Sequence, residues 1–260
     1  MAVAAPSPGT LSLRRVTLPG GAATTVHVAV YPRALVTAAV VLLAHAEPLA
    51  AWCARMGVAD AMVGGFFVTP AGPALGEVRV GGRPLPAAPV DPRFSGSRAC
   101  LHVDGAHVAI GPRAGLPAEP AGDLLQAGPR LVAGGVPVAR DGEDPEGFSA
   151  GSAQFDSDIT AGRHPRSAIG VDATRWVAVV TEGRAPGEAG LTLGELAAVM
   201  WDLGCVEALN LDGGGSASLV AGGRLVNSPH EAEGRAIPGG RPVMTALAFL
   251  PRAQPAAAAA

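Results

Sequence analysis

The residues best suited to chemistry lie in one short stretch that joins an acidic side chain, three consecutive glycines and a hydroxyl group. In order they are Asp212, Gly213, Gly214, Gly215 and Ser216. Because glycine has no side chain, the backbone N–H groups of such a turn can approach a ligand closely, and successive N–H groups form an anion-binding concavity. The stretch therefore predicts a phosphate site beside a bond that is cleaved with acid, base or nucleophilic help. A flexible turn between two strands is the alternative interpretation.

The segment around this turn contains the elements that would position it. We expect strands at Ser167–Val171, Trp176–Val180 and Cys205–Leu211, and a helix at Thr192–Leu203 that begins with a Thr-x-x-Glu capping box. A strand, a helix and a strand in this order predict a parallel crossover unit. We therefore expect an α/β (α+β) fold, in which a mixed β-sheet contains a β-α-β crossover and helices pack on the sheet.

Several polar residues adjoin these strands at the edge where such units bind ligands, beyond the carboxyl ends of the parallel strands. Glu182 follows the first parallel strand and Asp212 follows the second. Arg166 precedes the antiparallel strand, and a later hairpin returns Ser216 and Asn227 to the same edge. The pattern predicts that one arginine, two carboxylates, the glycine turn, a serine and an asparagine converge there.

Each of these side chains has a structural interpretation beside the functional one. Arg166 would hold a phosphate, because arginine pairs with phosphate through two hydrogen bonds, or it is a surface residue. Asp212 and Glu182 would share the acid/base or nucleophilic role; otherwise one caps a turn and the other lies on an exposed loop. Ser216 is expected to donate a hydrogen bond to the phosphate, since no nucleophile-elbow pattern surrounds it. Asn227 would assist it or only shape the following turn.

The composition indicates one globular domain and excludes several partners. The chain has 260 residues, of which 48% are hydrophobic, and no linker divides it, so we expect a single domain over residues 1–250 and a disordered alanine-rich tail over 251–260. A net charge of −3 without a basic cluster argues against nucleic acid. The apolar run Ala34–Ala46 is too short to span a bilayer and is expected to form a buried strand that leads into a helix at Glu47–Met56.

The termini, cysteines and histidines add three further expectations. No signal peptide is visible, and three widely spaced cysteines do not suggest a disulfide framework, so we expect a cytoplasmic protein. His102 and His107 would face each other across a hairpin at Asp104-Gly105. No third ligand accompanies this pair, so we predict no metal, and no cofactor is predicted either.

Several short motifs resemble those of the phosphodiester glycosidase family, in the same order along the chain. The matching segments are Gly64-Gly65-Phe66-Phe67, Gln126-Ala127-Gly128-Pro129, Arg166-Ser167-Ala168-Ile169-Gly170, Glu182-Gly183-Arg184, Gly190-Leu191-Thr192-Leu193, Asn210–Ser218 and Asn227-Ser228-Pro229. They cover about residues 60–250, and the aspartate–triglycine–serine stretch is the most specific. The resemblance implies that Gly64 and Gly65 belong to the binding site. Arg235 matches a family arginine and is implied as a second phosphate contact, with a solvated loop as the alternative.

The resemblance also implies an activity. The protein would be a hydrolase that cleaves the bond between a sugar anomeric carbon and a phosphate, and it would release free sugar and a phosphomonoester. Its substrate would be a small glycosyl phosphate, with no nucleic-acid or membrane partner. Val63 stands where the family commonly has asparagine. Two alternatives therefore stay open: a non-catalytic sugar-phosphate-binding protein, and a family member that acts on a small-molecule glycoside or nucleotide sugar in a biosynthetic pathway.

Overall fold

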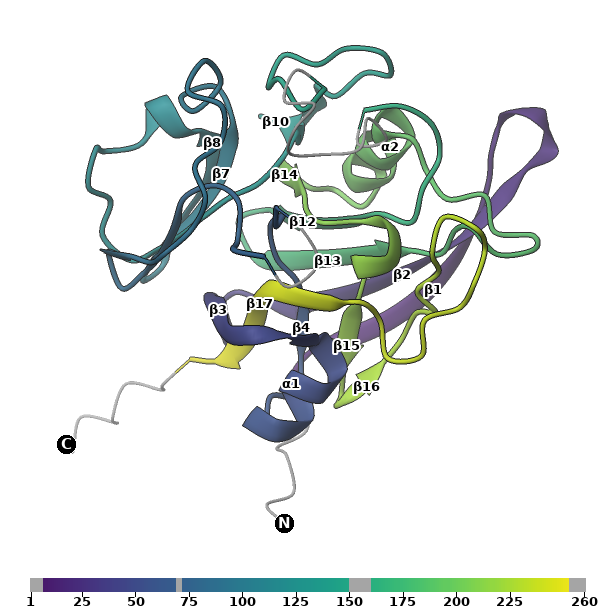
Figure 1. Cartoon of the computed structure of the whole chain (residues 1–260), viewed down its shortest axis with the longest axis horizontal. Coiled ribbons are helices and arrows are strands. Elements are labelled where there is room, and N and C mark those ends of the chain that lie inside the picture. The colour runs from purple at the N-terminus through teal and green to yellow at the C-terminus, as the bar shows by residue number, and fades with distance from the viewer. Residues whose placement is uncertain (1–6, 69–71, 150–159, 253–260) are drawn as a thin grey trace.

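Three antiparallel β-sheets and two short helices form the part of the chain that the structure describes (Figure 1). The computed structural model describes residues 7–68, 72–149 and 160–252. In spatial order the first sheet contains β1 (Thr10–Thr17), β2 (Ala23–Pro32), β13 (Arg175–Thr181), β12 (Ser167–Val171), β14 (Glu207–Asn210), β10 (Arg130–Ala133) and β11 (Val136–Pro137). The second contains β16 (Arg224–Leu225), β15 (Leu219–Ala221), β4 (Ala61–Val63), β17 (Pro242–Pro251) and β3 (Val36–Pro48). The third contains β6 (Arg83–Pro84), β5 (Val78–Val80), β9 (Asp123–Gln126), β7 (Ala99–Asp104) and β8 (His107–Pro112).

Helices are few in the described ranges. The two α-helices there are α1 (Leu49–Met56) and α2 (Leu193–Asp202), and the three 3-10 turns are η1 (Pro19–Gly21), η2 (Arg113–Gly115) and η3 (Gly214–Ser216). In Figure 1, α2 lies against the first sheet, α1 lies at the opposite end of the molecule, and the third sheet projects to one side. The protein is therefore mostly β.

The sheets correct one part of the prediction, the mixed β-sheet, and show no parallel pairing for the predicted β-α-β crossover. The strands before and after α2 are β13 and β14, and both pair antiparallel with β12, which lies between them. They run in the same direction but share no ladder. Every ladder between the named strands of the described ranges is antiparallel.

A tight hairpin explains why β13 and β14 share no parallel ladder. Asp172 Oδ1 accepts hydrogen bonds from Thr174 N and Arg175 N, both at 2.7 Å, and this Asx turn folds β13 directly back onto β12. The strand β12 then occupies the position that the expected parallel partner would take. Periodicity had identified the elements, but it carries no information about which strand pairs with which.

The local signals for α2 are confirmed. Thr192 Oγ1 accepts a hydrogen bond from Glu195 N (3.1 Å), and the Glu195 carboxylate accepts one from Thr192 N (3.0 Å), which completes the capping box. The buried face of the helix contains Leu193, Leu196, Ala197 and Met200, and this face packs on the first sheet. The predicted hairpin at Asp104-Gly105 also forms, between β7 and β8.

The apolar run near the N-terminus forms β3, which leads into α1, as predicted. Within the described ranges, no helix is both long and apolar enough to cross a membrane. One hydrophobic cluster joins all three sheets through residues such as Tyr31, Met62, Leu101, Ile169 and Leu247. Of the predicted alanine-rich tail, residues 253–260 lie outside the described ranges, and Pro251 ends β17.

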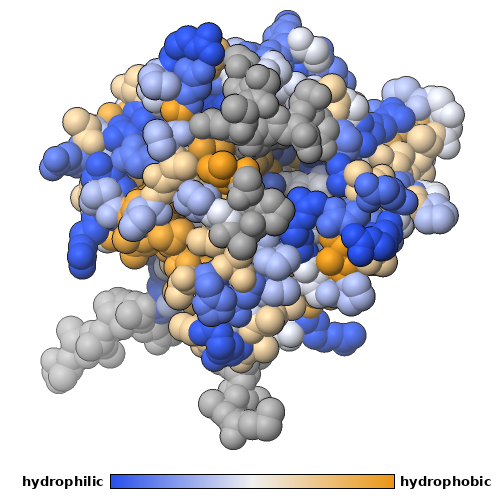
Figure 2. Space-filling view, in the orientation of Figure 1, coloured by the Kyte–Doolittle hydropathy of each residue, from blue (hydrophilic) through white to orange (hydrophobic). Residues whose placement is uncertain are grey.

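The visible surface differs between two areas (Figure 2). Apolar residues gather where the third sheet meets β3, whereas the area over the connection between β16 and β17 is mainly hydrophilic. That connection covers part of the edge described next.

Candidate functional site

The ends of β13, β12, β14 and β4 meet at one edge. Thr181 N donates a hydrogen bond to Arg166 O (2.8 Å), so the ends of β13 and β12 are joined just before Glu182. Asp212 N donates to Gly64 O (3.0 Å), which joins the ends of β14 and β4. The structure therefore brings together the backbones of these predicted site residues, although they come from separate parts of the chain. Their roles toward a substrate stay predictions.

Three N–H groups of the loop after β14 are bonded within the protein. Gly213 N donates to Asp212 Oδ1 (2.8 Å), Gly214 N to Pro165 O (2.8 Å), and Ser216 N to Gly213 O (3.1 Å). These three donors are bonded within the protein and do not face outward. The predicted role of the loop in binding an anion stays a prediction, and side chains beside the loop are further candidate donors.

Two guanidinium groups lie against the loop. A Cβ atom at Gly214 would lie 3.0 Å from Arg184 Nη1, and a Cβ atom at Gly215 would lie 3.2 Å from Arg241 Nε. Gly214 also has a φ of +58°, which residues with side chains rarely adopt. The glycines thus leave room for both arginines. Neither arginine was among the predicted site residues.

Arg184 combines an unusual backbone with a fixed side chain. Within the described ranges it is the only non-glycine residue with positive φ (+62°), a conformation that costs about 1–2 kcal/mol and that clusters at functional sites. Its Nη2 donates to His164 Nδ1 (3.2 Å), and His164 Nε2 lies 3.0 Å from Ala161 O. Since guanidinium only donates and a carbonyl only accepts, the two contacts are compatible when His164 Nδ1 accepts from Arg184 and Nε2 donates to Ala161.

The second guanidinium comes from the connection between β16 and β17, residues 226–241. Arg241 N donates to Gly215 O (3.1 Å), and the Arg241 side chain forms an ion pair with Glu231. Arg235, which the resemblance implied as a phosphate contact, lies on the same connection but is exposed, at a turn where its carbonyl accepts from Glu231 N (2.9 Å). Arg241 rather than Arg235 lies against the glycine loop.

The Glu182 carboxylate is held from two sides. His27 Nε2 lies 2.9 Å from Glu182 Oε1, and Ser228 N lies 3.0 Å from Oε1 and 3.2 Å from Oε2. His27 comes from β2 and is only 8% exposed. Glu182 is therefore not the freely exposed loop acid of the alternative interpretation. Sequence analysis missed His27, which lies 155 positions before its partner.

Arg166 is buried, with 4% of its surface exposed. Its Nε donates to Leu191 O (3.1 Å) and its Nη2 to Gly162 O (3.2 Å). These bonds exclude the surface-residue interpretation and show that Arg166 joins β12 to two neighbouring loops. Its predicted role as a phosphate ligand stays a prediction.

Asn227 uses both ends of its amide on the backbone. Its Oδ1 accepts from Leu219 N (3.1 Å) and its Nδ2 donates to Ala217 O (2.8 Å). The side chain thus holds the segment that follows the glycine loop. The predicted role of Asn227 toward a substrate stays a prediction.

The diglycine Gly64-Gly65 is required by close packing. A Cβ atom at Gly64 would lie 2.6 Å from Thr245 Oγ1, and one at Gly65 would lie 3.1 Å from Gln126 O. Any side chain here would displace β17 or β9 and, through the Gly64–Asp212 hydrogen bond, the loop after β14. The diglycine therefore supports the position of Asp212, and substrate binding by it stays a prediction.

Several buried polar atoms at this edge have no hydrogen-bond partner within the protein. They are Ser167 Oγ, Asn210 Oδ1, Ser216 Oγ and Ser218 Oγ. Buried polar atoms are nearly always bonded, because leaving one unpaired costs about 1–3 kcal/mol. Their presence at the ends of β12 and β14 and in the glycine loop marks this edge as one that is not optimised for stability alone.

The histidine pair is a structural feature of the third sheet. The rings of His102 and His107 lie 5.9 Å apart, and His102 Nε2 lies 2.6 Å from Ala121 O. Among the described residues, no three His, Cys, Asp or Glu side chains gather as metal ligands would.

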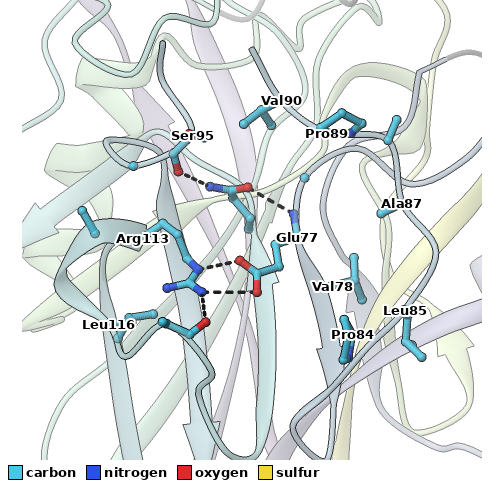
Figure 3. A pocket seen from close by; sticks show the side chains of 16 residues that line it. Glu77, Val78, Pro84, Leu85, Ala87, Pro89, Val90, Ser95, Arg113 and Leu116 are labelled. Carbon is cyan, nitrogen blue, oxygen red and sulfur yellow. Dashed lines mark hydrogen bonds and ion pairs between the residues drawn. The ribbon is translucent and has the colours of Figure 1, made fainter. Parts of the chain in front are cut away.

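A separate pocket of about 640 Å³ lies beside the third sheet (Figure 3). Its polar side contains Glu77, whose carboxylate lies 2.5 Å from both Arg113 Nε and Arg79 Nε. Gln126 accepts from Glu77 N (3.1 Å) and donates to Ser95 O (2.9 Å). Burial alone would raise the pKa of Glu77, but the hydrogen bonds from Arg113 and Arg79 outweigh it and lower that pKa. The polar groups of this pocket are thus bonded to one another.

Comparisons with known proteins add two kinds of finding. Residues 56–250 match the family described as phosphodiester glycosidase. A prophage-derived uncharacterized protein of Bacillus subtilis, YomE, is 32% identical over 76 residues, which are 29% of this chain and 12% of that protein. The chain therefore spans only a small part of that relative.

Solved structures share the fold. The catalytic domain of zebrafish N-acetylglucosamine-1-phosphodiester alpha-N-acetylglucosaminidase, auto-inhibited by its pro-peptide, has a TM-score of 0.72 at 20% identity over 94% of this chain and 83% of that chain. A hypothetical protein from Synechocystis has a TM-score of 0.64 at 20% identity, over 94% and 62% of the two chains. A putative exported protein from Burkholderia pseudomallei has 0.61 at 19%, over 91% and 76%.

Proposed function

This chain belongs to the phosphodiester glycosidase family, and from that premise we propose that it is a hydrolase acting on a sugar joined to phosphate through its anomeric carbon. Water would replace the phosphate at that carbon, the carbon–oxygen bond would break, and free sugar and a phosphomonoester would leave. The remaining questions are which side chains hold the phosphate and which act on the bond.

The observation that carries this proposal is the pair of guanidinium groups at the glycine loop. Arg184 lies against Gly214 and Arg241 against Gly215, and Asp212 immediately precedes the loop. Arginine binds phosphate with charge-assisted hydrogen bonds. Because Gly213 N, Gly214 N and Ser216 N are already bonded within the protein, we assign phosphate binding chiefly to these two side chains, with Ser216 Oγ as a further donor.

Asp212 and Glu182 would supply the two carboxylates that glycoside cleavage usually requires. They follow β14 and β13, the two neighbours of β12. Since adjacent strands lie about 4.8 Å apart, the two strand ends are about 10 Å apart, which leaves room for a sugar between side chains that lean toward each other. A phosphate leaving group is a weak base, so strong proton donation to it is unnecessary.

A direct screen tests the proposal. Purified protein would be incubated with sugar-1-phosphodiesters and with nucleotide sugars, and released free sugar would be measured against an Asp212→Asn control. We expect release from at least one substrate and none from the control. Binding without release by the wild type would favour the non-catalytic alternative.

The non-catalytic alternative was based on Val63, which stands where the family commonly has asparagine, and the position of Val63 in the fold weakens that argument. Val63 is fully buried in the cluster under α1, with Leu49 and Trp52. Its side chain therefore packs away from the edge where Asp212 and the arginines lie. A valine at this position removes no polar group from that edge.

A further inference from the structure

We propose that His27 is a positioning residue that orients the Glu182 carboxylate for the reaction; this inference rests on the proposed function. His27 belongs to β2, where it is the partner of Val180 in the antiparallel ladder with β13. Glu182 lies just beyond the end of that ladder. The neighbours Val26 and Val28 pack under α2, so the imidazole lies on the opposite face of the sheet, where Glu182 also turns.

Two hydrogen bonds hold the Glu182 carboxylate, and His27 makes one of them. Ser228 N–H can only donate, and it does so to the Glu182 carboxylate at 3.0 and 3.2 Å. The remaining contact joins His27 Nε2 and Glu182 Oε1 at 2.9 Å, and in this hydrogen bond the ring nitrogen is the donor and the carboxylate the acceptor. Two donors from different elements, β2 and the connection after β16, therefore fix the plane of the carboxylate.

Burying His27 and Glu182 together costs free energy of folding, which suggests that the pair serves the reaction. The side chains of His27 and Glu182 are only 10% and 12% exposed, and removing such groups from water costs free energy that a single hydrogen bond does not fully recover. An apolar residue opposite Val180 would pack there without needing a hydrogen-bond partner. Orientation of a carboxylate by imidazole is a recurring way to fix a reacting group.

His102 provides an internal comparison. It is buried to a similar extent, with 6% exposed, but its Nε2 contacts only the backbone oxygen of Ala121. It lies in the third sheet, away from the strand ends that carry Glu182. A substitution at His102 therefore reports the effect of losing a buried histidine without altering the edge at Asp212.

The experiment compares His27→Leu, His27→Gln and His102→Gln in steady-state hydrolysis of the best substrate found in the screen. We expect His27→Leu to lower kcat at least tenfold, because Glu182 would then rotate about its bond to Ser228. KM and the inhibition constant of inorganic phosphate should change less than about twofold, since the arginines at the glycine loop are untouched. His27→Gln keeps an N–H donor and should retain kcat within about threefold, and His102→Gln should match the wild type.

Each result decides between the possibilities. If the wild type is active and His27→Leu keeps its kcat, the assignment of His27 is wrong while the proposed function stands. The same conclusion follows if His27→Leu loses kcat, substrate affinity, phosphate affinity and melting temperature together, because that pattern indicates general loss of structure. If the wild type releases no sugar from any substrate, the proposed function fails and this inference fails with it.

A spectroscopic measurement covers the case in which His27→Leu does not fold. In protein labelled with 15N-histidine, we expect a protected Nε2–H proton for His27 whose resonance moves in Glu182→Gln. An unprotonated Nε2, or a resonance unchanged by Glu182→Gln, would overturn the inference.

Discussion

Two regions of this molecule combine arginine with carboxylate, and they satisfy their polar groups in opposite ways. In the pocket beside the third sheet, Glu77 lies between Arg79 and Arg113, and the amide of Gln126 is bonded at both ends. Among the described residues, none of the buried polar atoms without a partner lies in that pocket. Such an arrangement is what the stability of a buried ion pair requires.

The edge at Asp212 leaves several polar groups unpaired within the protein. Four buried polar atoms there have no hydrogen-bond partner in the protein, and Arg184 adopts a left-handed backbone conformation. The structure around these features keeps them in place although each costs free energy. The comparison teaches that paired charges beside a hollow are weak evidence of function. Unpaired polar atoms and backbone strain at converging strand ends are stronger evidence.

The largest expected effect comes from Asp212→Asn. Loss of an acid/base or nucleophilic carboxylate should lower kcat at least about a hundredfold, while the melting temperature changes little because asparagine has nearly the same shape. Glu77→Gln is the matched control, since it removes a carboxylate from the paired region and should leave kcat unchanged. Equal losses of activity in both variants would remove the distinction between the two regions.

Arg184→Ala should weaken phosphate binding more than stability. A charge-assisted hydrogen bond contributes about 1.5–3 kcal/mol, so the dissociation constant of inorganic phosphate should rise about tenfold or more. Arg113→Ala should instead lower the melting temperature, because Glu77 loses a partner, and leave phosphate affinity unaltered. Calorimetric titration of both variants measures this, and unchanged phosphate affinity in Arg184→Ala would show that the anion binds elsewhere.

Gly214→Ala should reduce phosphate affinity several-fold, because its Cβ would lie 3.0 Å from Arg184 Nη1. Gly81→Ala is a close control: Gly81 has a φ of +57°, against +58° for Gly214, but no atom lies within 4 Å of the added Cβ. Both variants should lose about 1 kcal/mol of stability from the backbone conformation alone. A phosphate affinity that falls equally in both would mean that backbone strain, and not the contact with Arg184, is responsible.

Features that depend on residues close together in the sequence could be predicted, and features that depend on contacts between distant segments could not. The capping box at Thr192 and the hairpin at Asp104-Gly105 are encoded within a few residues, and both formed as expected. The convergence of Arg166 and Asp212 could be predicted because each adjoins the end of a recognisable strand. The position of β12 between β13 and β14 could not, since several arrangements of the same strands satisfy the same periodicity.

The residues that were missed share a different property. His27 and Arg241 reach the site only through tertiary structure, from β2 and from the end of a long connection. Neither is flanked by a local pattern, and Arg241 is one of nineteen cationic residues. Arg184 carried a signal, because it followed Glu182-Gly183 in a matching motif, but its role depended on a backbone conformation that composition does not reveal.

The smallest expected effect is the pH dependence of the paired region. Because Arg113 and Arg79 lower the pKa of Glu77 in the folded protein, its ion pairs stabilise the fold fully above the unfolded value near 4.5, and this stabilisation is lost as pH falls through the lower folded pKa. The wild type should therefore exceed Glu77→Gln by about 1 kcal/mol in free energy of unfolding at pH 7, and the difference should vanish in strong acid. Glu119→Gln, in the exposed loop beside the same pocket, is the control variant that removes a carboxylate outside the ion pairs.

Urea unfolding of the three proteins from pH 7 into strong acid measures the free energy of unfolding of each variant relative to the wild type. A difference that grows as pH falls would contradict the assignment of Glu77 as an ionised partner of both arginines.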